Sequence, residues 1–426
     1  MRINLDYDRT YQIVEAPDRN LLGIIGGRAL KEVSADGPAW PMPAEALAAP
    51  VGSPRLHSLV SSGDKVAIVA SPALKAPVLP ALIEIILSEL SAKEVPDASV
   101  TVVVGRESGV QAPNALVAKK VGRRIYERVR CLWSDPDDFL RLGRTLSGTP
   151  VDVTASVVEA DKVIALGAVG YDQFAGYSGG AQTLIPLAAG KETADQSLRL
   201  TLRPGAEPGR IIGNPVREDL EAAAAMLPID FILDVVLDDA GRVVMAAAGH
   251  PLVAHRACCA FLDEQMSVEV DTPASIVLAS CGGAPFDKSL AKAMETLCRL
   301  RSLAAPEGII VLAAACPEGA GDEVMGEWLA WADHPMRIIE RAEGSLKPGG
   351  HLAAAFARIL REVRIFVVAE PALRNLQWPL LKAFATLDEA LRAAMARVGN
   401  SASIWVLPKG RSVLPRLREQ TELDLF

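Results

Sequence analysis

The chain has 426 residues, half of them hydrophobic, and its mean hydropathy is +0.23. That composition excludes a largely disordered chain, because disordered chains contain too few apolar residues to bury a core. With 44 basic and 52 acidic residues the formal net charge is −8, and no run concentrates the positive charge that a nucleic-acid-binding face needs.

Three further features narrow the class of protein. No stretch reaches the roughly 18 uninterrupted apolar residues of a membrane-spanning helix, and the opening MRINLDYDRTYQ alternates like a strand rather than a signal peptide. We therefore expect a cytoplasmic protein without a membrane partner. Histidine is scarce, so no metal site is predicted. The six cysteines lack Cys-x-x-Cys spacing and are expected to be free thiols: Cys131, Cys258, Cys259, Cys281, Cys298 and Cys316.

Short β-branched runs alternate with amphipathic stretches in the first part of the chain. Residues 64–70 predict a buried strand and residues 78–90 the helix that follows it, while residues 99–104 and 161–166 predict two more strands. This order is typical of a parallel sheet covered by helices, in which ligands bind beyond the carboxyl ends of the strands. The loops that follow the strands are therefore where a ligand is expected: residues 71–77, 105–111 and 167–190.

The second part of the chain repeats this alternation after a different-looking stretch. Gly213-Asn-Pro-Val-Arg217 opens a predicted helix, and residues 230–244 resemble a hairpin. Further strands are predicted at 275–280, 308–314, 365–369 and 403–407, with helices at 288–302, 323–331, 352–362 and 387–398. We predict an α/β fold of two domains, residues 1–270 and 271–426. Each has a mainly parallel sheet flanked by helices, with a ligand cleft between the domains.

The most unusual loop is Gly176-Tyr-Ser-Gly-Gly-Ala-Gln-Thr-Leu-Ile-Pro186, called here the glycine loop. Adjacent glycines permit positive φ angles and close backbone approach, so exposed N–H groups would suit an anion. A tight turn without a ligand is the alternative.

The residues around this loop resemble a known family. Val157-Val-Glu-Ala-Asp-Lys-Val-Ile-Ala-Leu-Gly167, followed by Phe174-Ala-Gly-Tyr-Ser-Gly-Gly-Ala181, is similar to the core of the nickel-dependent lactate racemases. Gly63-Asp-Lys-Val-Ala-Ile-Val69 and Gly213-Asn-Pro-Val-Arg-Glu-Asp219 fit the same family in the same order. The resemblance runs from about residue 1 to about residue 414. It implies a nickel-pincer nucleotide that takes hydride from a 2-hydroxy acid, with paired histidines that move the hydroxyl proton.

The chain departs from this family where the family does its chemistry. Gln182 stands where the family has the lysine that carries the cofactor, and Leu198 stands at the nickel-binding histidine. Asp172 and Glu107 align with the two catalytic histidines. Where the family has an arginine in the loop after the first strand, this chain has Leu74 with Lys75 beside it. These replacements argue against ordinary lactate racemisation.

Candidate functional residues follow from this alignment. Glu107 and Asp172 are the catalytic candidates, as a carboxylate pair that divides acid and base roles, or else as two solvated acids of a drifted site. Lys292 and Glu295 stand three residues apart on a predicted helix, where a solvated salt bridge is the ordinary explanation. The ligand-binding candidates are Gly179, Gly180, Gln182, Lys75, Arg106, Lys292 and Glu295.

Three functional hypotheses remain open. The first is a lactate-racemase-like protein that binds or transforms a small hydroxy or keto acid without the covalent cofactor. The second is a racemase or epimerase that depends on the nickel-pincer nucleotide in a remodelled site, and the third is a non-catalytic binding or regulatory paralogue. No cofactor is predicted under the first. If the chain is an enzyme, we expect an isomerase, and its partner is a small anionic organic molecule.

Overall fold

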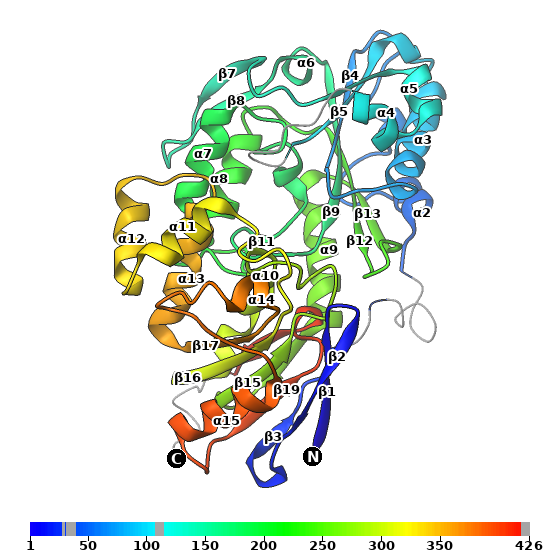
Figure 1. Cartoon of the computed structure of the whole chain (residues 1–426). Helices are drawn as coiled ribbons and strands as arrows, with labels where there is room; N and C mark the ends of the chain where they lie inside the picture. Colours follow the sequence, from blue (N-terminus) through cyan, green and yellow to red (C-terminus); the bar gives the residue numbers. More distant parts are fainter. Residues whose placement is uncertain (28–29, 31–39, 107–114, 419–426) are drawn as a thin grey trace, which may run out of the picture. The chain divides into compact units, whose positions relative to one another are not determined.

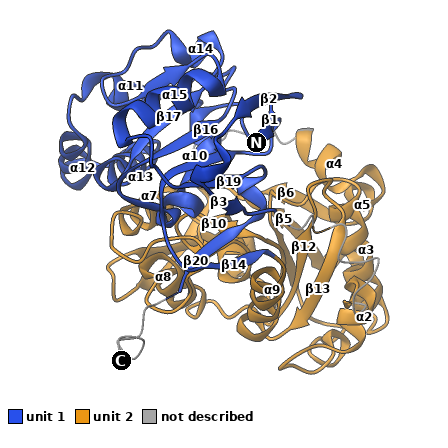
Figure 2. Ribbon diagram, turned by 90° about the horizontal axis from the view of Figure 1, so that it is seen from below, with its two compact units in different colours: residues 1–28, 266–426 blue, residues 29–265 orange. Residues whose placement is uncertain are grey.

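The computed structural model describes residues 1–27, 30, 40–106 and 115–418 (Figure 1). The chain forms two compact units, coloured separately in Figure 2. Unit 1 combines residues 1–28 with residues 266–426, and unit 2 comprises residues 29–265. The chain therefore starts in unit 1, builds unit 2 and returns to unit 1.

A six-stranded sheet forms the centre of unit 2, in the order β13-β12-β9-β4-β5-β6. Its pairs are parallel except for β12 with β13, which form an antiparallel hairpin. The strands are β4 (Val66–Ala70), β5 (Val100–Val104), β6 (Arg130–Trp133), β9 (Lys162–Val169), β12 (Phe231–Leu237) and β13 (Val243–Gly249). The apolar runs in β4 and β5 suit strands covered on both faces.

Helices pack against this sheet through apolar faces. The buried residues of α3 (Val78–Ser91) recur every three or four positions: Leu79, Leu82, Ile83, Ile86, Leu87 and Leu90. They join sheet residues such as Ile68 and Val102 in one core. The other helices of unit 2 are α2 (Pro43–Ala48), α4 (Ala115–Val121), α5 (Arg123–Arg128), α6 (Ala155–Val158), α7 (Lys191–Leu200), α8 (Pro215–Ala224) and α9 (Pro251–Met266).

Two small antiparallel ladders complete unit 2. One pairs β7 (Phe139–Arg144) with β8 (Pro150–Thr154). The other pairs β10 (Tyr171–Asp172) with β11 (Gly176–Tyr177), directly after β9. This second ladder carries the start of the glycine loop.

Unit 1 is built on an all-parallel sheet in the order β18-β17-β16-β15-β19-β3. Its strands are β3 (Leu21–Ile24), β15 (Ala274–Ser280), β16 (Ala304–Ala313), β17 (Arg364–Val368), β18 (Lys382–Phe384) and β19 (Ile404–Leu407). The helices are α10 (Leu290–Leu300), α11 (Glu323–Trp331), α12 (Pro335–Gly344), α13 (Gly350–Glu362), α14 (Pro371–Arg374) and α15 (Leu387–Val398). Two ladders flank it, β1 (Arg2–Tyr7) with β2 (Thr10–Glu15) and β14 (Ser267–Val270) with β20 (Leu414–Leu417).

The predicted α/β fold with two mainly parallel sheets is confirmed. The predicted domain division differs from the structure at the start of the chain, because residues 1–28 belong with the C-terminal part rather than with residues 29–265. The reason is long-range pairing and burial. Strand β3 pairs with β19, and Ile3, Leu5 and Tyr7 of β1 are buried in the core of unit 1. The sequence prediction also omitted α9, which covers residues 251–266.

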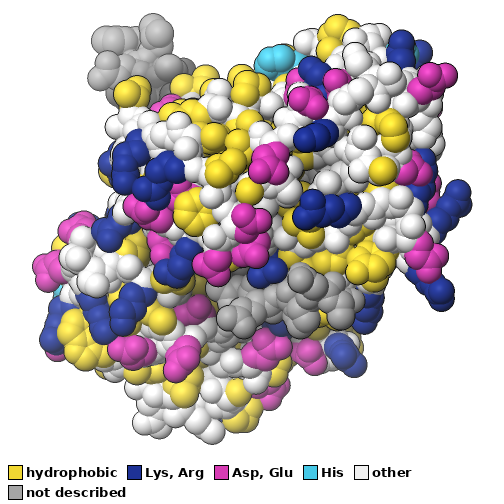
Figure 3. Space-filling view, turned by 90° about the horizontal axis from the view of Figure 1, so that it is seen from above, with side chains coloured by type: hydrophobic (Ala, Val, Ile, Leu, Met, Phe, Trp, Pro, Cys, Tyr) yellow, Lys and Arg dark blue, Asp and Glu magenta, His cyan; other side chains and the backbone are white. Residues whose placement is uncertain are grey.

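All six cysteines are free thiols, and burial raises the pKa of Cys281 to about 12. On the face drawn in Figure 3, Lys and Arg side chains are interspersed with Asp and Glu. Within the described ranges, no helix is both long enough and apolar enough to cross a bilayer.

Candidate functional site

The glycine loop follows β9 at the carboxyl end of that strand in unit 2. Its first residues pair back onto β10, with Asp172 opposite Gly176. Gly176 has a φ of +80°, and a Cβ at this position would overlap the carbonyl oxygen of Arg210. The loop then turns through a short 3-10 helix, Gly180–Thr183. Only glycine satisfies both the conformation and the close approach at residue 176.

The structure brings together two residues that the sequence singled out, Asp172 and Gln182. Asp172 Oδ1 accepts hydrogen bonds from the backbone N–H groups of Phe174 at 2.8 Å and Ala175 at 2.7 Å. Its Oδ2 accepts from Gln182 Nε2 at 3.3 Å. Both side chains are half-buried. The carboxylate of Asp172 therefore fixes the hairpin with one oxygen and holds the Gln182 amide with the other.

Gly179 and Gly180 have φ angles of +77° and +60°. The sequence predicted that N–H groups of this loop bind an anion. The N–H of Gly180 instead donates to Oδ2 of the chain's own Asp234, at 3.0 Å. A Cβ on Gly180 would lie 2.8 Å from Cγ of His255. The loop at this point is packed against the protein interior.

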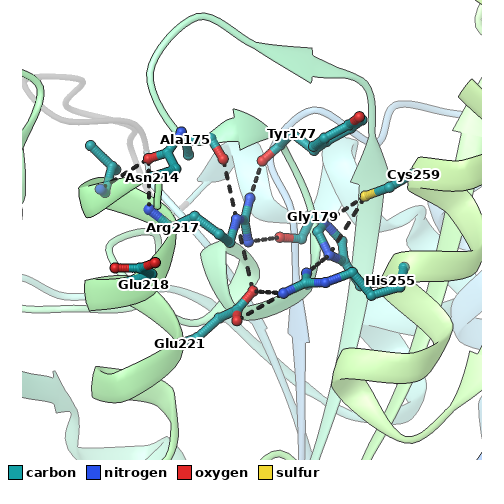
Figure 4. Close-up of polar contacts among 12 residues, drawn as sticks. Ala175, Tyr177, Gly179, Asn214, Arg217, Glu218, Glu221, His255 and Cys259 are labelled. Carbon is teal, nitrogen blue, oxygen red and sulfur yellow. Dashed lines mark hydrogen bonds and ion pairs between the residues drawn. The ribbon is translucent and has the colours of Figure 1, made fainter. Parts of the chain in front are cut away.

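Beneath the loop lies Arg217, which comes from α8 and is fully buried (Figure 4). Its guanidinium donates to the carbonyl oxygens of Ala175 at 3.2 Å and Gly179 at 3.3 Å, and also to that of Tyr177. Burial lowers its pKa, opposed by the negative charge of Glu221, whose Oε1 lies 4.0 Å from Nε. One side chain thus binds three alternate carbonyls of the loop and its approach.

Asn214 places Arg217 by capping helix α8. Its Oδ1 accepts from the N–H groups of Val216 and Arg217 at 3.0 and 3.1 Å, which satisfies two free donors of the first turn. Its Nδ2 donates to the carbonyl oxygen of Phe174 at 2.8 Å. The Gly213-Asn-Pro motif therefore both starts the helix and ties it to the loop.

His255, from α9, completes this network. Its Nε2 lies 2.9 Å from the carbonyl oxygen of Ser178, and a carbonyl only accepts, so Nε2 carries the proton. Nδ1 accepts from Arg256, which is itself paired with Glu221 at 2.7 Å. Burial and the charges of Arg217 and Arg256 hold the pKa of His255 well below its usual value. The imidazole is neutral, and both nitrogens are occupied.

Two tyrosines anchor the same region from another side. The hydroxyl groups of Tyr171 and Tyr177 both donate to Asp263 Oδ1, at 2.8 and 2.7 Å. Burial raises the pKa of Tyr177 above its usual value, as does its hydrogen bond to Asp263. These hydroxyls hold β10 and β11 against α9 rather than donating protons to a substrate.

Asp234 is an acid in the middle of the apolar strand β12 and is fully buried. Burial raises its pKa to about 7, and the Gly180 N–H acts in the opposite direction. Among the described residues, its Oδ1 has no hydrogen-bond partner, and neither has the buried Oγ1 of Thr183. A Cβ on Gly167 would overlap Asp234 Oδ1 and lie 2.9 Å from Thr183 Oγ1, so both oxygens line the same small space.

Two other residues predicted for unit 2 form no hydrogen bond or ion pair with the Asp172–Gln182 pair that the structure describes. Arg106 is half-buried, its backbone N–H donates to the Leu187 carbonyl at 2.8 Å, and its Nε is buried with no hydrogen-bond partner in the described part of the chain. Lys75 is exposed, whereas Leu74 is fully buried in the core of unit 2. Glu107 lies outside the described residues, so its pairing with Asp172 stays a prediction.

Lys292 and Glu295 lie in unit 1, on α10. They form an ion pair of 3.2 Å, and both side chains are at least one-third exposed. The N–H of Lys292 is bound by the hydroxyl of Ser289, which caps the helix. This arrangement is an ordinary surface pair between positions i and i+3.

Sequence reasoning missed the buried charges that support the loop. A single acid inside the apolar run Phe231–Leu237 is a signal for Asp234, because a charged residue in such a strand is rare. No comparable signal marks Arg217, whose partners are carbonyls up to 42 residues away. In the ranges that the structure describes, no group of three or more His, Cys, Asp or Glu side chains is arranged to hold a metal ion.

Comparison with known proteins adds a family to this geometry. Residues 7–209 match the model of the lactate racemase N-terminal domain, and residues 269–415 match that of the lactate racemase C-terminal domain. The lactate racemase of Thermoanaerobacterium thermosaccharolyticum is 27% identical over 429 residues, covering 97% of this chain and 99% of that protein. That of Lactiplantibacillus plantarum is 28% identical over 378 residues, covering 86% and 88%.

Solved structures agree with the sequence matches. The lactate racemase apoprotein from Thermoanaerobacterium thermosaccharolyticum superimposes with a TM-score of 0.87 at 25% identity, covering 98% of this chain and all of that one. A protein from Thermotoga maritima has a TM-score of 0.59 at 16% identity, over 83% and 94% of the two chains, which is a likeness of fold.

Proposed function

Because the chain belongs to the lactate racemase family, we propose that it binds a small 2-hydroxy or 2-keto acid at the carboxyl edge of the unit 2 sheet. We further propose that it does so without a covalently attached nickel-pincer nucleotide. The chain is lactate-racemase-like in sequence and fold. What distinguishes it is the set of side chains at the positions where the family holds its cofactor.

The observation that carries this proposal is the hydrogen bond from Gln182 to Asp172. By its resemblance to the family, the first residue replaces the cofactor-bearing lysine and the second replaces a catalytic histidine. An amide nitrogen is not nucleophilic, because its lone pair is delocalised into the carbonyl, so Gln182 cannot form the linkage that the lysine forms. Its Nε2 is instead a donor to Asp172.

A neighbouring replacement and the ion pair of a nearby acid support the same conclusion. Leu198, at the position of the nickel-binding histidine, has no lone pair to donate to a metal. Asp195, the nearest acid on the same helix, is paired with Lys191 at 2.9 Å. The residues present do not fit the family's cofactor.

The remaining polar groups suit a small acid. Arg106 has a buried Nε without a partner among the described residues, and a guanidinium binds a carboxylate with two parallel hydrogen bonds. Strands β5 and β9 are separated by β4, so their ends lie roughly 10 Å apart. Asp172 Oδ2, bound to Gln182 at a long 3.3 Å, is the oxygen that would accept a ligand hydroxyl.

The test combines binding with cofactor analysis on the purified full chain. Thermal unfolding is measured with sodium L-lactate, D-lactate, pyruvate and chloride, and a ligand at 100 times its Kd stabilises the fold by about 2.7 kcal/mol. Arg106→Gln should abolish the shift, and Arg123→Gln, which alters an exposed ion pair in the same unit, should not. Nickel content and intact mass are measured in parallel.

Two results would overturn the proposal. Stoichiometric nickel together with a mass above that of the polypeptide would show that the cofactor is attached after all. The absence of any shift with the organic acids relative to chloride would remove the proposed ligand class.

A further inference from the structure

Of three cavities in unit 1, two lie along the amino ends of strands, away from the carboxyl ends where ligands of such sheets bind, and the third lies along β18 and α14. One of about 260 Å³ is lined by residues of β17 and β18, and one of about 510 Å³ by residues at the starts of β15 and β16. Arg364 and Arg397 line both. The third, of about 340 Å³, shares Lys382 with the first. Neighbouring cavities therefore share cationic side chains in their walls.

The 260 Å³ cavity is cationic in a chain whose net charge is −8. Arg364, Lys382 and Arg397 line it, and its acid, Asp333, is already paired with Arg337 at 3.1 Å. Neither Lys382 nor Arg397 forms an ion pair with any residue that the structure describes. Arg364 approaches Glu307 at 3.7 Å, and both are well exposed, so this contact neutralises little of its charge.

Apart from His334, the rest of this cavity is lined by apolar residues. Its lining includes Leu360, Val363, Ile365, Phe366, Pro379 and Leu380. The ammonium of Lys382 lies over the Phe366 ring, 5.9 Å from its centre, and Phe366 is only 4% exposed. The accessible apolar surface beside this charge therefore comes from Leu360, Pro379 and Leu380. An inorganic anion would contact the cationic side chains but would not cover the apolar ones.

Helix electrostatics explain only part of this arrangement. Arg397 lies in the last turn of α15, and Arg364 follows the end of α13, where a positive charge offsets the negative end of the helix dipole. Lys382 has no such role, because it is the first residue of strand β18. Three cations from three elements converge on one hollow.

We propose that this cavity is a second ligand site, which binds an organic anion made of a carboxylate or phosphate group on a flat apolar ring. The anionic group lies between Arg364 and Arg397, and the ring lies against the accessible apolar side chains Leu360, Pro379 and Leu380. A volume of about 260 Å³ is just below the ~300–1,000 Å³ of sites for drug-sized ligands, which suits a single ring with one substituent. The site is independent of the function proposed for unit 2.

The test titrates the full chain with phenyl phosphate, benzoate, inorganic phosphate and benzyl alcohol by isothermal calorimetry. We expect phenyl phosphate or benzoate to bind, and the tighter of the two identifies the anionic group. Benzyl alcohol and inorganic phosphate should bind at least about tenfold more weakly, because each lacks one half of the ligand. Binding should also weaken as sodium chloride is raised.

Variants locate the site. The double variant Arg364→Gln, Arg397→Gln should lose at least about tenfold in affinity, and Lys382→Gln should lose less. Arg9→Gln, which removes an exposed arginine from another part of unit 1, should bind like the parent. Equal affinity in the parent and the double variant, no binding of either ring anion, or equal binding of inorganic phosphate would each overturn the proposal.

Discussion

The backbone N–H of Gly180 donates a hydrogen bond of 3.0 Å to Asp234 Oδ2, which joins the glycine loop to the middle of strand β12. Two buried groups thus hold the loop: the Asp234 carboxyl group and the Arg217 guanidinium, which binds the carbonyl of Gly179. Both Asp234 and Arg217 are buried, so we expect substitutions at either residue to change the free energy of unfolding of the protein. The predictions below begin with these supports.

The Asp234 carboxyl should make stability depend on pH. Its pKa is raised to about 7 by burial, so the folded state holds this proton more tightly than the unfolded state does. The free energy of unfolding contributed by Asp234 is therefore greatest below pH ~4 and falls as the pH rises towards 7. At about 1.4 kcal/mol per unit of pKa, the loss between pH 5 and 7.5 is up to ~3 kcal/mol.

Urea unfolding at several pH values checks this. Asp234→Asn, whose amide can donate towards Thr183 Oγ1, should have a flatter stability profile between pH 5 and 7.5 than the parent and be the more stable protein at pH 7.5. Glu159→Gln, at an exposed site, should leave the profile of the parent unchanged. Parallel pH profiles for the parent and Asp234→Asn would contradict the prediction.

Gly180→Ala should destabilise unit 2. The residue has a φ of +60°, and a Cβ would lie 2.8 Å from the ring of His255, which hydrogen bonds hold in place on both nitrogens. We expect a loss of about 2–4 kcal/mol in the free energy of unfolding. Gly63→Ala is the matched control, because a Cβ there meets no atom within 4 Å. Similar urea midpoints for the two variants would be the opposing result.

Arg217→Met should be more damaging than a surface arginine change. The substitution keeps much of the side-chain volume but leaves the carbonyl oxygens of Ala175, Tyr177 and Gly179 without their buried donor. We expect a loss of about 3–5 kcal/mol, measured by urea unfolding. Arg123→Met, at a site that is 90% exposed, should change stability by less than about 0.5 kcal/mol. Comparable losses in both would show that the loop does not depend on Arg217.

Gln182→Lys should not restore lactate racemisation. It returns an amine, but Leu198 still offers no metal ligand, and Asp172 and Glu107, which the resemblance to the family matches to its two catalytic histidines, are unchanged. Because residues that act as a unit are strongly non-additive, one repair recovers almost nothing. Chiral chromatography of lactate, with the variant produced alongside the enzymes that make the cofactor, measures the outcome.

The smallest set with a chance of activity is Gln182→Lys, Leu198→His, Asp172→His and Glu107→His combined. Racemisation above the parent's background by Gln182→Lys alone would mean that these positions are not the ones matched to the family.

The local sequence pattern was enough to predict some elements and contacts of this structure, but not those that depend on residues far apart in the chain. The run at 66–70 is apolar throughout and the run at 100–104 is apolar except for Thr101, as expected of strands buried on both faces, and that pattern is visible in the sequence. The meeting of Asp172 with Gln182 spans only ten residues. The role of Arg217 is different, since burial of a charge depends on carbonyls brought by the fold. The assignment of residues 1–28 likewise depends on a strand near the other end of the chain.

Because of that long-range pairing, unit 1 can be completed only late in translation. Strand β3 ends at Ile24, whereas its partner β19 begins at Ile404, so about 380 residues must be translated between them. At ~5–20 residues per second this takes roughly 20–80 s. During that interval all of unit 2 emerges and can fold. The apolar side of the first hairpin, with Ile3, Leu5 and Tyr7, has no surface to cover it until β15 and β16 have emerged. During that period the apolar side chains of this hairpin lack the strands that bury them in the folded unit.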